Sequence, residues 1–259
     1  MKFVKYLANG NDFIFIDSHV GHNLLNDSTK IKLLCDRHKG IGGDGLILAD
    51  THKKKMFFFN PDGHEAKMCG NGARCFLDYM WQQDTQYVSE FFVWDEKYKA
   101  IIDQNKIWVQ IKIFPQKLNL EDFKSIKNVK NVFFINLGVP HIVFHLSQLE
   151  KIDFVSWARK IRFDKNFPQG TNVNVIDSKK NNVLNVRTYE RGVEAETLSC
   201  GTGIVASAMA ALNFWGWDFP IKVKTQAGFA QIQKKGEDIF FSGEVSKVFT
   251  GTFCESIFL

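Results

Sequence analysis

Apolar positions along the chain follow two periods, one typical of strands and one typical of helices. Short apolar runs bounded by turn residues, such as GLILAD (45–50) and HIVFHL (141–146), indicate buried strands. Runs with apolar residues three and four positions apart indicate helices, and Asp27 or Ser28 is suited to cap the first of them. Helices are therefore predicted at 27–38, from about 70 to 83, at 155–164 and from about 201 to 214.

The two halves of the chain repeat the same plan. Each half has strands, then a helix that begins behind Cys-Gly-x-Gly, and then a meander of strands. The two cysteines, Cys69 and Cys200, are 200 − 69 = 131 residues apart, about half of the 259-residue chain. We therefore expect two similarly folded domains, each wrapped around one apolar helix. A change in composition at Pro115 places residues 1–115 in the first domain and 116–247 in the second, with the last strand (about 248–259) joined to the first.

Composition excludes several classes of protein. Hydrophobic residues make up 45% of the chain and charged residues 24%, as in soluble globular proteins. The net charge of +5 is mild, and the compact basic run Lys53–Lys55 precedes an apolar strand, which predicts a solvated turn rather than a nucleic-acid patch. Polar residues interrupt the first dozen positions, and no apolar run could span a bilayer. We expect a cytoplasmic protein without nucleic-acid or membrane partners.

Neither a disulfide framework nor a metal site is predicted. The five cysteines form no Cys-x-x-Cys pair, and the seven histidines show no zinc-binding spacing. Cys35, Cys75 and Cys254 are interpreted as structural, buried thiols. The segment GIGGDG (40–45) matches G-x-G-x-x-G, but it follows a helix and leads into a strand. Because a dinucleotide site has the reverse order, we predict a tight helix-to-strand loop there.

Cys69 and Cys200 each stand directly before a Gly-x-Gly that begins a helix. The first N–H groups of a helix lack intrahelical partners, and with the helix dipole they form a carboxylate site. The same field is expected to lower the pKa of both cysteines from about 8.5. A single copy suggests a nucleophile. Two copies suggest an acid–base pair, in which a thiolate removes a Cα proton and a thiol delivers one to the opposite face. The helix N-termini would stabilise the carbanion without a metal or pyridoxal phosphate.

The sequence resembles the diaminopimelate epimerase family. This resemblance implies an α+β fold of two pseudo-symmetric domains, each a mostly antiparallel sheet wrapped around a central helix. It also implies a cofactor-independent isomerase that interconverts LL- and meso-2,6-diaminopimelate in lysine and peptidoglycan precursor biosynthesis, and it suggests a homodimer. The matching segments, in the family's order, are GNDF (10–13), DRHKGIGGDGL (36–46), FNPDGHEAKMCGNGARC (59–75), GVPHIV (138–143), TNVNV (171–175) and YERGVEAETLSCGTG (189–203).

The resemblance also assigns roles to individual residues. Cys69 and Cys200 match the two catalytic cysteines, and His141 and Glu190 match residues that tune the cysteine pKa values. The distal end of the substrate is a zwitterion, which suits amide and carboxylate acceptors together with a bidentate arginine. The substrate-binding positions are Gly70, Asn71, Gly201 and Thr202 for the reactive carboxylate, and Asn11, Asn60, Asn172, Glu190 and Arg191 for the distal end.

The chain departs from the family pattern at four places around the distal pocket. Val139 replaces an asparagine, Leu7 stands where a histidine is common, and Gly45 stands where many members have a glutamine. The loop RGVEAETLSC (191–200) is one residue longer than the commonest form. None of these departures alters the two Cys-Gly-x-Gly motifs.

Two alternatives stay open. One is a proline racemase or hydroxyproline epimerase of the same fold. Those enzymes tend to have a histidine where Asn71 stands, and they lack Tyr-Glu-Arg-Gly. The other is a non-catalytic amino-acid-binding relative, against which the retention of both thiols argues. The sequence does not determine which thiol is ionised at rest.

Overall fold

The chain divides into two compact units. The computed structural model describes residues 1–82, 88–103, 105–114, 116–124, 126–146, 152–179, 183–254 and 258. One unit comprises Met1–Gln110 with Ser242–Leu259, and the other comprises Ile111–Phe241. The units divide after Gln110 and after Phe241, whereas the sequence suggested boundaries at 115 and 247, and Pro115 itself lies outside the described residues.

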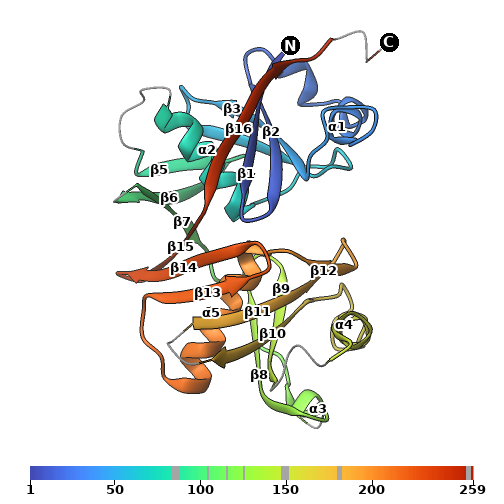
Figure 1. Cartoon of the computed structure of the whole chain (residues 1–259), viewed down its shortest axis with the longest axis vertical. Helices are drawn as coiled ribbons and strands as arrows, with labels where there is room; N and C mark the ends of the chain where they lie inside the picture. The colour runs from blue at the N-terminus through green and yellow to red at the C-terminus, as the bar shows by residue number, and fades with distance from the viewer. Residues whose placement is uncertain are drawn as a thin grey trace. The chain divides into compact units, whose positions relative to one another are not determined.

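The described part of the first unit is a sheet with the helices α1 and α2 and the 3₁₀ turn η1 (Figure 1). Its strand order is β16-β1-β2-β3-β4-β5-β6-β7, with β16 antiparallel to β1. The last strand of the chain is thus paired with the first. The elements are β1 (Lys2–Ala8), β2 (Asn11–Asp17), η1 (His22–Leu24), α1 (Ser28–Cys35), β3 (Gly45–Asp50), β4 (Lys55–Phe59), α2 (Gly70–Gln82), β5 (Glu90–Val93), β6 (Glu96–Asp103), β7 (Lys106–Ile111) and β16 (Val245–Thr252).

The second unit has the strand order β15-β14-β13-β11-β10-β9-β8, and the short β12 pairs with β11. Its elements are α3 (Glu121–Lys124), β8 (Val129–Asn136), β9 (Pro140–Leu146), α4 (Phe154–Arg162), β10 (Asn172–Lys179), β11 (Val183–Glu190), β12 (Ala195–Thr197), α5 (Gly201–Trp215), β13 (Ile221–Thr225), β14 (Gly228–Lys235) and β15 (Asp238–Gly243). Two strands cross a unit boundary: Ile111 of β7 belongs to the second unit, and Ser242 and Gly243 of β15 belong to the first.

The two units share one topology. From β1 to β6, successive neighbours pair antiparallel, parallel, antiparallel, parallel and antiparallel. From β8 to β14 the neighbours repeat that series. A parallel pair needs a crossover connection, and α1, α2, α4 and α5 lie in those four connections. The predicted α+β fold of two pseudo-symmetric, mostly antiparallel domains is confirmed.

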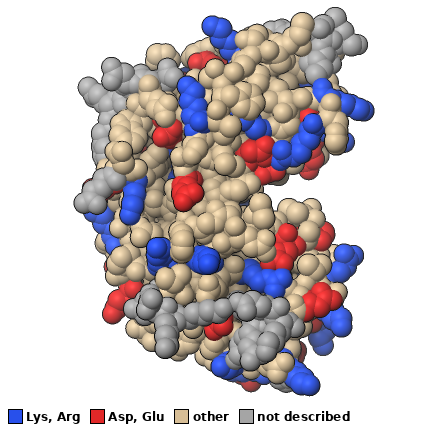
Figure 2. Space-filling model, in the orientation of Figure 1, with Lys and Arg blue, Asp and Glu red and all other residues tan. Residues whose placement is uncertain are grey.

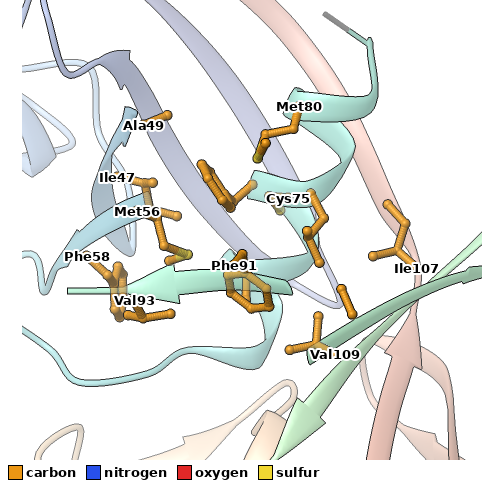
Figure 3. Close-up of a cluster of buried hydrophobic side chains, with 14 of the residues drawn as sticks. Ile47, Ala49, Met56, Phe58, Cys75, Met80, Phe91, Val93, Ile107 and Val109 are labelled. Carbon is orange, nitrogen blue, oxygen red and sulfur yellow. The ribbon is translucent and has the colours of Figure 1, made fainter. Parts of the chain in front are cut away.

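In the first unit, β2 and β3 are buried on both faces, which explains their nearly continuous apolar sequences. Successive side chains of a strand point to opposite faces. Phe13 and Phe15 of β2 therefore lie in the cluster that surrounds α2, as does Ile47 of β3 (Figure 3). Ile14 and Leu46 lie in the cluster that contains the α1 residues. The two helices thus cover opposite faces, as Figure 1 shows.

The second unit uses the same alternation. Ile142 and Phe144 of β9 and Val173 of β10 pack in a cluster with Phe154 and Ala158 of α4. The opposite face of these strands contacts α5, whose buried residues include Ala206, Ala208, Ala210 and Ala211. Small side chains let the strands approach the helix axis closely. Side chains alternate between the two faces of a strand, so five polar residues lie on the face toward α5: His141, Asn172, Asn174, Thr188 and Glu190.

The first predicted helix is shorter than expected. Asp27 caps α1, and its carboxylate accepts the N–H of Lys30 at 3.0 Å, as the sequence indicated. The helix ends at Cys35 rather than at His38, because Asp36 is extended and its carboxylate accepts the N–H groups of His38 and Lys39 instead. The segment 36–44 joins α1 to β3, so the predicted helix-to-strand loop is confirmed.

The basic run is a turn that leads into β4, as predicted. The Nζ of Lys53 lies 3.7 Å from Oδ2 of Asp50, and the Nζ of Lys55 lies 2.8 Å from Oδ1 of Asp95. On the face seen in Figure 2, basic and acidic side chains are intermingled. Among the described residues, no helix has both the length and the apolar character needed to cross a membrane.

Candidate active site

Cys69 immediately precedes α2, and its backbone and thiol both contact the first turn of that helix. The Ala73 N–H donates to the Cys69 carbonyl at 2.8 Å, and the Gly72 N–H points at the Cys69 Sγ at 3.4 Å. Cys69 is half-buried. The thiol therefore sits where helix N–H groups can stabilise negative charge, as the sequence predicts.

Asn71 connects this turn to the start of β2. Its side chain is 2% exposed, and its Nδ2 donates to Asn11 Oδ1 at 2.6 Å. The Nδ2 of Asn11 donates in turn to Asp44 at 3.1 Å. The structure thus brings together Cys69, Gly70, Asn71 and Asn11, all expected to contact substrate, and adds Asp44, which sequence reasoning did not single out.

A charged cluster holds the backbone beside Asn11. Arg37 donates to both carboxylate oxygens of Asp12, at 3.0 and 2.6 Å, and to Asp44 at 2.8 Å. The Lys5 ammonium lies 2.8 Å from Asp12. Burial opposes ionisation of Asp12, but hydrogen bonds from Arg37 and Lys5 hold the pKa of its carboxyl well below the usual range. The family segments GNDF and DRHKGIGGDGL therefore meet through these charges.

Asn60 lies apart from this network. It is exposed at the end of β4, and its backbone N–H donates to the His64 carbonyl at 2.9 Å.

Cys200 is the N-cap residue of α5 and repeats the geometry of Cys69. Its Sγ accepts the Gly203 N–H at 3.4 Å and lies 3.5 Å from the Thr202 hydroxyl. Cys200 is more buried than Cys69, with 6% of its surface exposed. The structure therefore brings Gly201 and Thr202 to the thiol, as expected from the sequence.

The expected lowering of the Cys200 pKa is wrong. Burial raises the pKa of this thiol well above its usual value, and the negative charge of Glu190 raises it further. Hydrogen bonds from Thr202 and Gly203 oppose this shift without reversing it. Glu190 itself accepts a short hydrogen bond from the Thr197 hydroxyl. The Cys200 side chain is consequently a thiol at neutral pH.

His141 is completely buried and uncharged. Its Nε2 lies 3.3 Å from Asn172 Nδ2, and its Nδ1 lies 3.2 Å from Asn174 Nδ2. Burial, with a smaller contribution from the Arg191 charge, lowers the pKa of His141 to about 3. His141 thus offers a neutral imidazole rather than a cation.

Asn174 and Thr188 support the second turn and were not singled out from the sequence. The Thr188 hydroxyl donates to Asn174 Oδ1 at 2.9 Å, and Asn174 Nδ2 donates to the Ile142 carbonyl at 3.2 Å. The segment NVNV contains the signal, because its two asparagines alternate with valines and must share one face of β10.

The longer loop before Cys200 is held in place by the carboxylate of Glu194, which is one of its own residues. Glu194 has a left-handed backbone, with φ 57°, and its carboxylate accepts the Gly192 N–H at 3.0 Å. Arg162 of α4 donates to the same oxygen through Nε at 3.0 Å and Nη2 at 2.7 Å. Arg191 donates its backbone N–H to Asn172 at 2.8 Å and its Nη1 to the Gln169 carbonyl at 3.1 Å. The loop therefore holds Arg191 and Asn172 together.

The other departures from the family pattern have different surroundings. Leu7 is 41% exposed on β1. Gly45 has no room for a side chain, because a Cβ there would lie 2.7 Å from both the Phe58 ring and the Phe59 carbonyl. Val139 is half-buried, and its carbonyl accepts the Leu137 N–H at 3.1 Å.

The remaining cysteines differ from one another. Cys35 and Cys75 are buried, as expected, but Cys254 is exposed, so the interpretation of that thiol as buried is wrong. Cys254 follows β16 near the end of the described chain, where no core covers it. No disulfide joins any of the five cysteines. Within the part of the chain that the structure describes, no three His, Cys, Asp or Glu side chains are grouped to hold a metal ion.

Comparison with known proteins identifies the family. The diaminopimelate epimerase family model matches residues 3–94 and 133–248. A diaminopimelate epimerase from Methanothrix thermoacetophila is 36% identical over 277 residues, covering 99% of this chain and 97% of the relative. One from Aquifex aeolicus is 34% identical over 276 residues and covers 99% of both chains. The solved structure of a PhzF-family phenazine biosynthesis protein from Bacillus anthracis has a TM-score of 0.69 and 13% identity, covering 97% of this chain and 98% of its own, which supports the fold alone. The chain belongs to the diaminopimelate epimerase family.

Proposed function

We propose that this protein is an isomerase that interconverts LL- and meso-2,6-diaminopimelate without a cofactor, on the way to lysine and peptidoglycan precursors. The observation that carries the proposal is the pair of Cys-Gly-x-Gly turns, which begin α2 and α5 at matching places in two units of one topology. Full-length similarity to diaminopimelate epimerases supports the substrate. The free thiols suit a reducing compartment, and we place the protein in the cytoplasm, acting as a homodimer on a small molecule.

The proposed reaction is a proton exchange at one α-carbon. One thiolate removes the Cα proton, and the other thiol delivers a proton to the opposite face. N–H groups of the two turns, at Gly70–Asn71 and Gly201–Thr202, bind the carboxylate into which the carbanion charge spreads. We assign the distal amino-acid end to Asn11, Asn60, Asn172, Glu190 and Arg191.

The burial and charge around Cys200 support a resting state in which this residue is the thiol. Its pKa is raised by burial and by Glu190, so it keeps its proton at neutral pH. We therefore assign the proton-donating role, in the first turnover, to Cys200 and the proton-abstracting role to Cys69. His141 is neutral and contributes orientation rather than charge.

The substrate is tested with an amino-acid panel in deuterated water, with reductant and no added cofactor. We expect deuterium at Cα of LL-diaminopimelate, together with formation of the meso form, measured by mass spectrometry and chiral chromatography. Exchange with proline or 4-hydroxyproline, and none with diaminopimelate, would assign the chain to the other isomerases of this fold. Calorimetric binding of diaminopimelate without any exchange would identify a non-catalytic relative.

Glu190→Gln should move the high-pH limb of the activity profile to lower pH. The limb reports loss of the proton that Cys200 must donate. Because the Glu190 charge raises the Cys200 pKa, removing that charge lowers it, by about one unit for a nearby charge. The measurement is kcat/KM from pH 6 to the highest pH at which the protein stays folded.

Thr197→Val provides the matched control, because it removes the hydrogen bond to Glu190 and keeps the charge. Its high-pH limb should stay near that of the unaltered protein. A limb in Glu190→Gln that stays in place or moves upward would contradict the assignment of the proton to Cys200.

A further inference from the structure

Arg74 is a completely buried cation in α2, close behind the Cys69 turn. Its Nη2 donates to Asn9 Oδ1 at 2.6 Å and to Asn71 Oδ1 at 2.9 Å. Its Nη1 donates to the Gly70 carbonyl at 3.2 Å. The planar guanidinium therefore joins the β1–β2 turn, which contains Asn9, to the two residues that follow Cys69.

The chain is packed closely around this contact. Asn9 is 3% exposed. A Cβ at Gly243 would lie 2.0 Å from Asn9 Oδ1 and 3.2 Å from Arg74 Nη2, so the backbone at 243 passes directly over the pair. Asn71, held by Arg74 on one side, donates to Asn11 on the other. A change at Arg74 thus reaches a proposed substrate-binding residue through one side chain.

The turn itself does not require a guanidinium. In α5, which begins with the same Cys-Gly-x-Gly motif, the matching position is Val205, which is also completely buried. A charge buried at this point costs free energy that an apolar residue would avoid. The difference between the two units therefore needs a reason beyond folding.

Charge supplies that reason. Burial lowers the pKa of Arg74 to about 10, so the side chain is still cationic at neutral pH. Negative charge on Cys75 or Cys69 would stabilise it. Cys75 is completely buried, which raises its pKa and keeps it a thiol, and Cys69 is the more exposed of the two. Because the attraction between two charges is mutual, Arg74 favours the ionised form of Cys69.

Other ionisable groups near α2 have their own partners. Tyr6 donates to Asp78 at 3.0 Å, and Lys5 pairs with Asp12. The positive charge of Lys247 stabilises the Asp78 carboxylate, which lies farther along the helix. Glu65 and Lys67, before Cys69, are exposed and opposite in charge. The ionisable side chains on the strands that pack against α2 are Lys2, Lys5 and Tyr6 of β1, Asp50 of β3, Lys55 of β4 and Lys247 of β16.

We infer that Arg74 is a positioning residue for the first cysteine turn, which fixes Asn71 against Asn11 and favours the thiolate of Cys69 through its positive charge. The two turns are then chemically distinct, with a cation behind Cys69 and the Glu190 carboxylate beside Cys200. The catalytic consequence rests on the proposed function, but the effect on Cys69 does not.

The test is the pH dependence of Cys69 alkylation by iodoacetamide without substrate, followed by peptide mass spectrometry to separate Cys69 from the exposed Cys254. In Arg74→Met the midpoint should move up by about one pH unit. At pH values below both midpoints, alkylation should then be about tenfold slower. Arg74→Lys keeps the charge and should keep the midpoint, but it loses the planar fork, so kcat/KM should fall about tenfold.

Tyr6→Phe is the control for general weakening of α2, because it removes a hydrogen bond to Asp78 away from the cysteine turn. It should lower the melting temperature and leave the Cys69 midpoint in place. A folded Arg74→Met variant with an unchanged midpoint overturns the charge role. If Arg74→Met does not fold, Arg74→Lys decides, and an unchanged kcat/KM in that variant overturns the positioning role. If the unaltered protein showed no epimerase activity, that result would contradict the proposed function. The shift of the alkylation midpoint would still test the effect of Arg74 on Cys69.

Discussion

Replacing either Cys69 or Cys200 with alanine should stop epimerisation while diaminopimelate still binds. A positioned acid or base contributes about 10²–10⁴-fold. Inversion needs both groups, so we expect kcat to fall at least about a thousandfold in each variant. Binding should survive because the proposed hydrogen-bond donors to the substrate carboxylate are backbone N–H groups, which alanine retains. The measurements are chiral chromatography of the product and titration calorimetry with substrate.

Solvent exchange in the two variants distinguishes two thiols from one. Each variant keeps one thiol, on one face of the α-carbon. Cys200→Ala retains Cys69 as the base, so it should exchange the α-proton of one diastereomer without forming the other. In Cys69→Ala the remaining Cys200 holds its proton at neutral pH, so exchange of the other diastereomer should be slower. Cys254→Ala is the matched control, since that thiol is exposed and distant in sequence from both turns. It should retain activity within about twofold, as surface substitutions usually do. Full epimerisation in Cys69→Ala or Cys200→Ala would rule out the two-thiol reaction.

The order of strands and helices in this chain was predictable because the residues that begin the helices act locally in the sequence. Glycines after Cys69 and Cys200, and the cap at Asp27, determine where helices begin. The apolar sequences of β2 and β3 arise because helices cover both faces. The end of α1 was missed because the Asp36 carboxylate competes for the N–H groups of His38 and Lys39, and a helical pattern does not reveal that competition.

The chemistry of the site was less predictable, because it depends on contacts between distant segments. The helix N-terminus at Cys200 suggested a lowered pKa, but burial and a carboxylate on the neighbouring strand β11 outweigh it. Arg74 looks like an ordinary polar position of a helix until the fold places Asn9 and Gly243 around it. Residue identity indicated the reacting groups, whereas their ionisation required the tertiary structure.

Gly203→Ala should lower kcat/KM about a hundredfold, the cost of misplacing a reacting group by about 1 Å. A Cβ at 203 would lie 2.5 Å from Asn174 Oδ1, 3.0 Å from Thr188 Oγ1 and 3.2 Å from Cys200 Cβ. Asn174 cannot move aside, because it accepts from Thr188 at 2.9 Å and contacts His141 Nδ1 at 3.2 Å. The turn must shift instead, and the Cys200 thiol with it. Steady-state kinetics measures the fall in kcat/KM. Thermal unfolding measures the accompanying loss of stability, which should be about 1–3 kcal/mol.

Gly72→Ala is the matched substitution in the first unit and should be much milder. A Cβ at 72 would lie 3.0 Å from Ile47 Cδ1, the end of a flexible side chain, and 3.6 Å from Cys69 Cβ. Ile47 can rotate away, so kcat/KM should fall less than about fivefold, within the spread of ordinary packing changes. Shortening the side chain at 174 makes room for the new methyl group. Asn174→Ser should therefore lower kcat/KM less in the Gly203→Ala background than it does alone. Equal losses in Gly72→Ala and Gly203→Ala would show that the amide at 174 does not hold the second turn. The difference between them follows from a single contrast, a methyl group behind one cysteine turn and a hydrogen-bonded amide behind the other.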